Sequence, residues 1–263
     1  MSIIDFHVHI FPDKIAEKAT RAVGKFYDIP MALDGKLSTA LTCMNRAGVR
    51  RFVAHSVATT PAQVESINRF ILASHAAYPD RILPFAALHP DLPDVEKTMD
   101  EIVGDGFLGV KIHPDIQGFR LDDPRVLKMI GAVAGRLPLL IHTGDYRYDN
   151  SGPERMNRVL DLFPNLVAVC AHLGGYSEWE RAAASPLPGR KNVYVDTSSS
   201  LYALSPARAA EIIRSYGVEH VLFGTDYPMW EPSEELDRFF RLPLTEEEQE
   251  LILHKNAERL LRL

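Results

Sequence analysis

The sequence predicts an α/β protein and, within that class, a (β/α)8 barrel of the TIM type. Eight short apolar runs recur along the chain at intervals of about thirty residues, and segments with helical periodicity separate most of them. Most of these runs also stop at a histidine or an aspartate. Nearly continuous apolar strands that alternate with helices indicate a parallel sheet buried on both faces. Eight such units are the number that a barrel requires.

The whole chain, residues 1–263, is expected to form a single domain. Its 263 residues suit one large α/β unit, and no tract rich in proline, glycine and serine divides them. A doubly wound open sheet is the alternative architecture. No Gly-x-Gly-x-x-Gly turn follows an early strand, which disfavours a dinucleotide-binding version of that sheet.

The predicted strands are short and apolar. Pro84 interrupts the third of them, so we expect that strand to begin late. The eight strands are placed at residues 3–9, 51–55, 82–89, 107–113, 137–142, 166–172, 193–196 and 221–226.

The predicted helices lie between the strands, and the last of them closes the chain. Ser38 is a suitable N-cap, Gly48 follows a helix end, and Thr245 with Glu248 fits a capping box. Residues 26–36 show no clear period and are predicted to form a loop. The helices are placed at 11–24, 38–47, 61–78, 91–103, 122–135, 153–163, 178–184, 206–216, 233–240 and 245–261.

Composition narrows the classes of function. A net charge of −6 disfavours a nucleic-acid binder, and no apolar run approaches the ~18 residues of a membrane span. Cys43 and Cys170 lie far apart in apolar surroundings, which indicates buried free thiols in a reducing compartment. No signal-peptide pattern precedes His7, so a cytoplasmic protein is expected. A homodimer is an open alternative for its assembly state.

The polar residues that end the strands indicate a metal site. His7 and His9 share one face of the first strand, and two imidazoles side by side can form half of a tetrahedral site. An exposed strand end with two incidental histidines is the alternative. In a barrel, the carboxyl ends of the strands converge on one rim. Further strands end at His55, His89, His113, His142, His172, Asp196 and Asp226.

Imidazole and carboxylate groups without a cysteine cluster suit one divalent metal ion, zinc in the first place and manganese as the alternative. Seven of the ten histidines lie at strand ends. The other three, His75, His220 and His254, do not fit this pattern and are assigned structural or surface roles. Such a protein would act on a small-molecule substrate.

Four motifs together resemble the amidohydrolase superfamily, and their order and spacing most resemble its amidohydrolase-related branch, which includes aminocarboxymuconate-semialdehyde decarboxylases. The C-terminal Asn256-Ala257-Glu258-Arg259-Leu260 is similar to the closing helix of that branch. The motifs are Asp5-Phe6-His7-Val8-His9, Ile141-His142-Thr143-Gly144, Ala171-His172-Leu173-Gly174-Gly175 and Gly224-Thr225-Asp226-Tyr227-Pro228.

The resemblance implies a role for each matched residue. His7, His9, His142 and Asp226 would bind the metal, and Asp226 would also shuttle a proton. His172 would orient water and substrate, with ligation of a second metal as the alternative role.

Strand four carries two further candidates. In binuclear members of the superfamily a lysine on this strand is carboxylated and bridges two metals, which Lys111 could also do. Our hypothesis is instead that Lys111 and His113, which share a face, bind an anionic group of the substrate. His55 and His89 are candidates for substrate contact or for packing under loops. Arg147 is a candidate anchor for a substrate carboxylate or a solvated loop charge.

The first hypothesis for function is a metal-dependent hydrolase that uses a metal-activated water on an amide, ester or lactone of a small anionic substrate. The alternative is a non-oxidative decarboxylase of a conjugated or aromatic acid. A TatD-like deoxyribonuclease is disfavoured, because that family places a glutamate on strand four where this chain has Lys111 and His113. A barrel that binds a metal or ligand without turnover is the non-enzymatic alternative.

Overall fold

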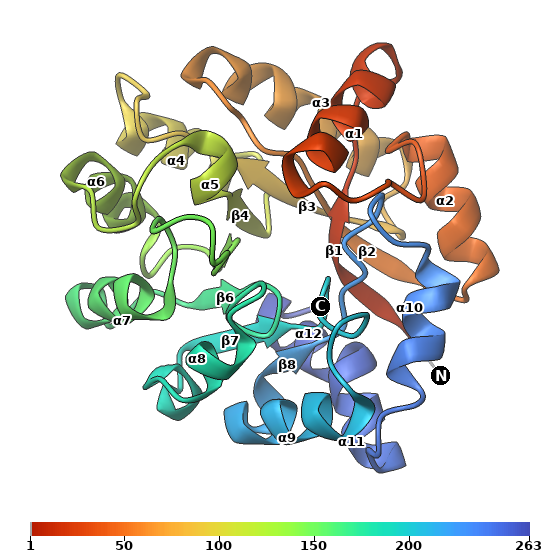
Figure 1. Cartoon of the computed structure of the whole chain (residues 1–263). Coiled ribbons are helices and arrows are strands. Elements are labelled where there is room, and N and C mark those ends of the chain that lie inside the picture. The colour runs from red at the N-terminus through yellow and green to blue at the C-terminus, as the bar shows by residue number, and fades with distance from the viewer. Residues whose placement is uncertain (1) are drawn as a thin grey trace.

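The computed structural model describes residues 2–263, and eight parallel strands form a barrel at its centre (Figure 1). The sheet order follows the chain from β1 to β8. The barrel closes where Phe6 donates its N–H to the Phe223 carbonyl (2.8 Å) and His9 donates to the Tyr227 carbonyl (2.8 Å). The predicted barrel is therefore confirmed. The strands are Ile4–His9, Arg51–His55, Ile82–Ala87, Gly109–Ile112, Leu139–Ile141, Ala168–Cys170, Val193–Asp196 and Val221–Leu222.

Helices surround the barrel on its outside (Figure 1). Short 3-10 turns lie at Pro61–Gln63, Leu187–Gly189 and Val218–His220, and a π-helical turn at Leu251–Lys255 joins the last two helices. The helices α1 to α12 are Asp13–Tyr27, Leu37–Arg46, Val64–Ala77, Val95–Gly104, Pro114–Gln117, Pro124–Val133, Pro153–Leu162, Trp179–Ala183, Pro206–Tyr216, Pro232–Phe239, Glu246–Glu250 and Asn256–Leu261.

Two local predictions were wrong. Helix α1 does not end at Gly24 but runs to Tyr27; a Cβ on Gly24 would lie 2.9 Å from the Ile29 carbonyl oxygen, so this glycine serves close packing instead of ending the helix. Strand β3 begins at Ile82 despite Pro84, because Pro84 pairs through its carbonyl, which accepts the N–H of Leu108 (2.9 Å).

The amino-terminal end of the barrel is filled with apolar side chains. Ile4, Phe6, Phe85 and Leu140 lie in one buried cluster, and Ala257 of α12 packs against it. The predicted closing helix is present, and it packs against the amino-terminal end of the barrel. The polar residues are left for the opposite end, where the active sites of such barrels lie.

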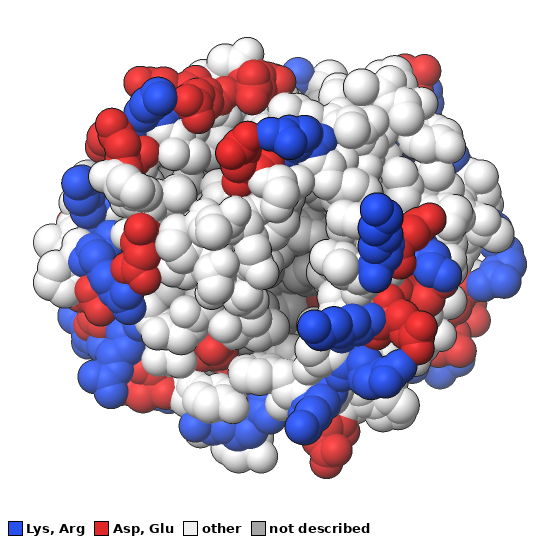
Figure 2. Space-filling view, turned by 90° about the horizontal axis from the view of Figure 1, so that it is seen from above, with Lys and Arg blue, Asp and Glu red and all other residues white. Residues whose placement is uncertain are grey.

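The surface carries charges of both signs, as expected for a chain with a net charge of only −6. Figure 2 shows Lys and Arg interspersed with Asp and Glu on one face of the molecule, around a hollow bordered largely by uncharged side chains. Within residues 2–263, no helix is long and apolar enough to cross a lipid bilayer. Cys43 and Cys170 are buried and unpaired, as expected.

Candidate metal centre and substrate cavity

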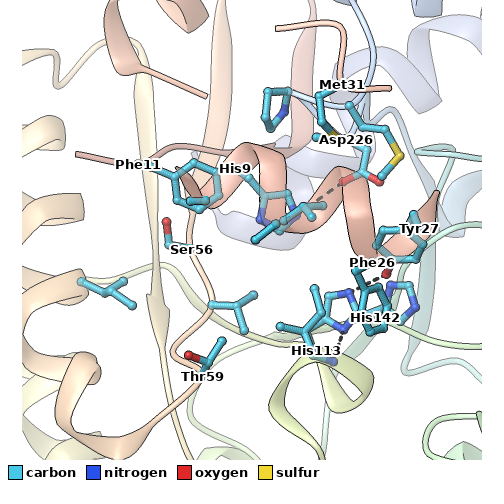
Figure 3. A pocket seen from close by; sticks show the side chains of 18 of the residues that line it. His9, Phe11, Phe26, Tyr27, Met31, Ser56, Thr59, His113, His142 and Asp226 are labelled. Atoms are coloured by element: carbon cyan, nitrogen blue, oxygen red, sulfur yellow. Dashed lines mark hydrogen bonds and ion pairs between the residues drawn. The ribbon is translucent and has the colours of Figure 1, made fainter. Parts of the chain in front are cut away.

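Two side chains of β1 and one from the loop that follows β8 form a triangle of donor atoms. His7 Nε2 and His9 Nε2 are 3.3 Å apart, and each lies 3.4 Å from Asp226 Oδ1. Figure 3 shows His9 and Asp226 facing each other. A tetrahedral ion with bonds of ~2.0–2.1 Å separates its ligand atoms by about 3.3–3.4 Å. The spacing of His7, His9 and Asp226 therefore fits one face of a divalent-metal site.

Asp196 fixes the orientation of His7. Its Oδ2 lies 2.8 Å from His7 Nδ1, and both groups are buried. Burial alone would raise the pKa of Asp196, but the contacts with His7 and with the Ser198 hydroxyl outweigh it and hold the pKa well below its usual range. The ionised carboxylate accepts the Nδ1 proton, so the lone pair on Nε2 faces the triangle. Carboxylates play this supporting role behind many metal-bound histidines.

Burial keeps the neighbouring imidazoles neutral, which is the form that binds metals. It lowers the pKa of His9 to about 4 and those of His55 and His172 well below the usual value. The ring of His55 lies 4.3 Å from that of His9, and neither of its nitrogens has a hydrogen-bond partner among residues 2–263. Buried nitrogens without a hydrogen-bond partner are rare in folded proteins. The cluster of His7, His9 and His55 therefore fits a site that a bound cation completes.

Lys111 lies beneath the triangle and does not line the cavity above it. Its Nζ donates to His7 Nε2 at 3.1 Å. Burial lowers its pKa to about 8, because the charged ammonium is poorly solvated there. The structure therefore places Lys111 against a candidate metal ligand, deeper than a residue that would meet the substrate directly.

His142 and His172 form the next part of the centre. His142 Nδ1 lies 2.9 Å from His172 Nε2, and His142 Nε2 lies 3.3 Å from Asp115 Oδ2. One nitrogen of His172 can share an ion-sized space with His7 and Asp226. The two nitrogens of His142 thus face His172 and Asp115, and His142 reaches the triangle through its neighbour His172.

His113 and Tyr27 form a hydrogen-bonded pair on the cavity wall (Figure 3). Nδ1 of His113 accepts the N–H of Ile116 at 3.3 Å, and burial lowers the pKa of His113 well below its usual value. The neutral ring must carry its proton on Nε2, which donates to the Tyr27 hydroxyl at 2.7 Å. The proton of Tyr27 is therefore available to another acceptor.

The other two predicted substrate contacts lie outside the cavity wall. Arg147 donates to the Asp145 carboxylate (2.6 Å) and to the Phe26 carbonyl (2.8 Å), and its guanidinium lies over the Phe26 and Tyr27 rings. Its charge is thus engaged in holding the end of α1. His89 accepts the N–H of Asp91 at 3.2 Å in the loop after β3. Neither of them lines the cavity.

The backbone is strained where two of these side chains leave their strands. His172 and Asp226 have φ values of 60° and 63°, in the left-handed region that non-glycine residues rarely adopt. Such conformations cost about 1–3 kcal/mol and cluster at functional sites. They turn His172 and Asp226 towards the barrel axis.

The cavity above the centre has a volume of about 660 Å³. Its inner end carries the polar groups just described, and its outer walls are mostly apolar. The sequence reasoning missed Tyr27, because it ended α1 too early, and it assigned no role to Asp196 or Asp115. The inner end is lined by His7, His9, His113, His142, His172, Tyr27, Tyr176, Ser199 and Asp226.

Comparisons of sequence agree with this geometry. A family model described as amidohydrolase matches residues 4–263. A curated relative, decarboxylase orsB from Emericella nidulans, is 28% identical over 125 residues, which cover 40% of this chain and 37% of that protein. The chain thus matches well under half the length of this relative.

Solved structures share the fold over nearly the full chain. An uncharacterised TIM-barrel protein from Bordetella bronchiseptica superposes with a TM-score of 0.78 at 25% identity, covering 100% of this chain and 99% of that one. The 2,6-dihydroxybenzoate decarboxylase from Rhizobium superposes with a TM-score of 0.73 at 20% identity, covering 100% of this chain and 99% of that one. A dihydroxybenzoic acid decarboxylase from Polaromonas was solved with manganese and the inhibitor 2-nitroresorcinol. It superposes with a TM-score of 0.74 at 16% identity, covering 100% of this chain and 97% of that one.

Proposed function

Since the chain belongs to the amidohydrolase family, we propose that it is a metal-dependent, non-oxidative decarboxylase of a hydroxylated aromatic acid. The observation that carries the proposal is the triangle of His7, His9 and Asp226 at the inner end of a cavity with aromatic walls. The names of orsB and of the dihydroxybenzoate decarboxylases support the reaction type. A flat apolar ring suits these walls better than a polar amide does.

The metal would be held by His7, His9 and Asp226. The further ligand, which the sequence assigns to His142, would be His172, because one of its nitrogens shares an ion-sized space with His7 and Asp226 whereas His142 contacts His172 and Asp115. Manganese is favoured over zinc by the neighbour that was solved with it. When bound, the ion supplies positive charge that holds the carboxylate and the adjacent hydroxyl oxygen of the substrate.

The side chains around the ion position the substrate and move one proton. The Tyr27 hydroxyl donates to a substrate oxygen, because His113 occupies its acceptor side. Asp226 takes the proton of the substrate hydroxyl and delivers it to the ring carbon that bears the carboxylate. The bond between that carbon and the carboxylate then breaks, and carbon dioxide leaves. The phenolic oxygen regains a proton from solvent as the product departs.

His172 holds the arrangement in register in this proposal. Its Nδ1 donates to the Ser198 carbonyl at 3.0 Å, which leaves Nε2 facing the centre. Its left-handed backbone fixes the direction of the ring. His55 and Lys111 do not line the cavity, but both are buried in contact with His7 or His9 and would influence the electrostatics of the centre.

The test is a substrate panel on protein loaded with manganese. Hydroxylated benzoic acids are monitored for carbon dioxide release, and esters and lactones are assayed in parallel. Asp226→Asn should abolish turnover, whereas the control His220→Gln should retain it, because His220 bonds only the Val193 carbonyl (2.8 Å) at the other end of the barrel. Hydrolysis of an ester or lactone without carbon dioxide release from any acid would reject the proposal in favour of the hydrolase hypothesis.

A further inference from the structure

Helix α1 has two apolar faces, and only one of them packs against the protein. Ala16, Thr20 and Gly24 are buried against the fold. A second stripe, which includes Ile15 and Val23, lines the cavity, and 49% of the Ile15 side chain is exposed. Contact with water does not stabilise large apolar side chains, so we expect this stripe to contact a bound molecule.

The opposite wall is apolar as well. Ile67 and Phe70 of α3 line the same cavity as the stripe on α1. We call the space between these two helices the apolar arm. Its apolar residues are Ile15, Ala19, Ala22 and Val23 on α1 and Ile67 and Phe70 on α3, and Lys18 and Ser66 of the same two helices also line the cavity.

The apolar arm is larger than a single-ring acid needs. Ile15 and Val23, the two ends of the apolar arm on α1, are eight residues apart and therefore separated by about 12 Å along the helix. The cavity of about 660 Å³ lies in the range that holds drug-sized ligands. A dihydroxybenzoate bound at the metal centre would leave the outer part of this volume unfilled.

We propose that the substrate carries an apolar chain on its aromatic ring and that the apolar arm binds this chain. The inference rests on the proposed function, and it names the class of substrate: alkyl-substituted hydroxybenzoic acids. The occupant is assigned to the substrate and not to a second copy of this chain, because the arm and the metal centre belong to one continuous cavity. A chain on the ring of a molecule whose carboxylate is held by an ion at His7, His9 and Asp226 would extend into this arm.

Burial of one methylene contributes about a fourfold gain in affinity. Binding should therefore strengthen with chain length until the arm is full. The probes are resorcinol and its 5-methyl, 5-propyl and 5-pentyl derivatives, titrated calorimetrically into the manganese-loaded protein. The 5-pentyl compound should bind at least about tenfold more tightly than the 5-methyl compound.

Substitutions on α1 locate the binding site of the chain. Ala22→Trp fills the apolar arm and should bring the ratio of the two dissociation constants close to one, and Ala19→Phe provides a second, smaller obstruction. Lys14→Trp is the matched control, since Lys14 is exposed on α1 and does not line the cavity. This control should keep the ratio of the wild-type protein.

The outcomes separate this inference from the proposed function. A chain-length dependence that Ala22→Trp removes supports the inference, even if no acid is decarboxylated. Decarboxylation of dihydroxybenzoates together with equal affinities along the series overturns the inference and retains the function. A ratio that Ala22→Trp and Ala19→Phe leave as it is also overturns it. A dimer that Ala22→Trp dissociates would assign the arm to a second copy of the chain and would equally overturn it.

Discussion

Loss of the Asp226 carboxylate should separate metal-dependent stability from the stability of the fold. If the triangle binds manganese, free metal at a thousand times its dissociation constant stabilises the folded protein by about 4 kcal/mol. For a chain of this size, that corresponds to a rise in Tm of about 8–16 °C. Metal that binds elsewhere on the surface would not depend on Asp226.

In Asp226→Asn, a neutral amide replaces the negative ligand that lies 3.4 Å from both imidazoles. Loss of a supporting residue already costs 10–100-fold in affinity, so loss of a ligand should cost at least about 100-fold. The same metal concentration is then at most about ten times the dissociation constant, and the stabilisation falls to about 1.4 kcal/mol or less. The rise in Tm should shrink to about 3–6 °C or less.

Differential scanning calorimetry with manganese and with a chelator measures both quantities. The metal-free Tm of Asp226→Asn should stay close to that of the wild type, because the amide has the same shape and still accepts from the Ser199 hydroxyl, which lies 2.5 Å from Oδ2. The control His220→Gln should show the full metal-dependent rise. An equal rise in Asp226→Asn and in the wild type would refute the assignment of the metal to the triangle.

Three further changes test two residues of the centre and one buried carboxyl group on α10. Asp196→Asn frees the tautomer of His7 and should weaken manganese binding about 10–100-fold in a metal titration; unchanged affinity would deny Asp196 its supporting role. Tyr27→Phe removes one donor and should raise KM about tenfold with a smaller effect on kcat, whereas an unchanged KM would show that Tyr27 does not meet the substrate. Burial raises the pKa of Glu235 to about 7 despite the nearby Arg238. The folded state therefore holds a proton that the unfolded state loses between about pH 4.5 and pH 7, and stability falls as the pH rises through that window. Glu235→Gln should stabilise the protein by roughly 2–3 kcal/mol at pH 8 and hardly at pH 4 in urea unfolding, and equal effects at both values would contradict this linkage.

The barrel and the triangle could be predicted because they depend on regular geometry. An alternating strand puts His7 and His9 on one face whatever else the chain does. Closure of an eight-stranded barrel then brings the end of the last strand beside the first, which places Asp226 next to them. The structure places the donor atoms of these residues 3.3–3.4 Å apart, and the left-handed backbone at Asp226 completes the approach that the topology begins.

Residues that depend on a helix end or on a local ion pair could not be predicted in this way. A glycine at position 24 indicates a helix end, yet Gly24 lies inside α1. Its contact with Ile29 leaves no room for a side chain, and this packing explains the glycine. Tyr27 was consequently assigned to a loop. Arg147 follows Asp145 by two residues, and the sequence does not tell whether such a charge pairs with its neighbour or with a ligand.

Strand ends nominate a set of residues, but the backbone conformation beyond the last strand residue decides which of them reach the centre. His55 is the last residue of β2 and pairs in register with His9, so the two imidazoles lie side by side. His89 comes two residues after β3 ends at Ala87, and the chain has already carried it out of the cavity. His172 follows the end of β6 by the same two residues, yet its left-handed backbone turns it back towards the axis. A left-handed φ at a histidine has no signature in the apolar pattern of the strands, so strand ends alone do not separate His89 from His172. The folded chain shows which of the two leaves the centre and which returns to it.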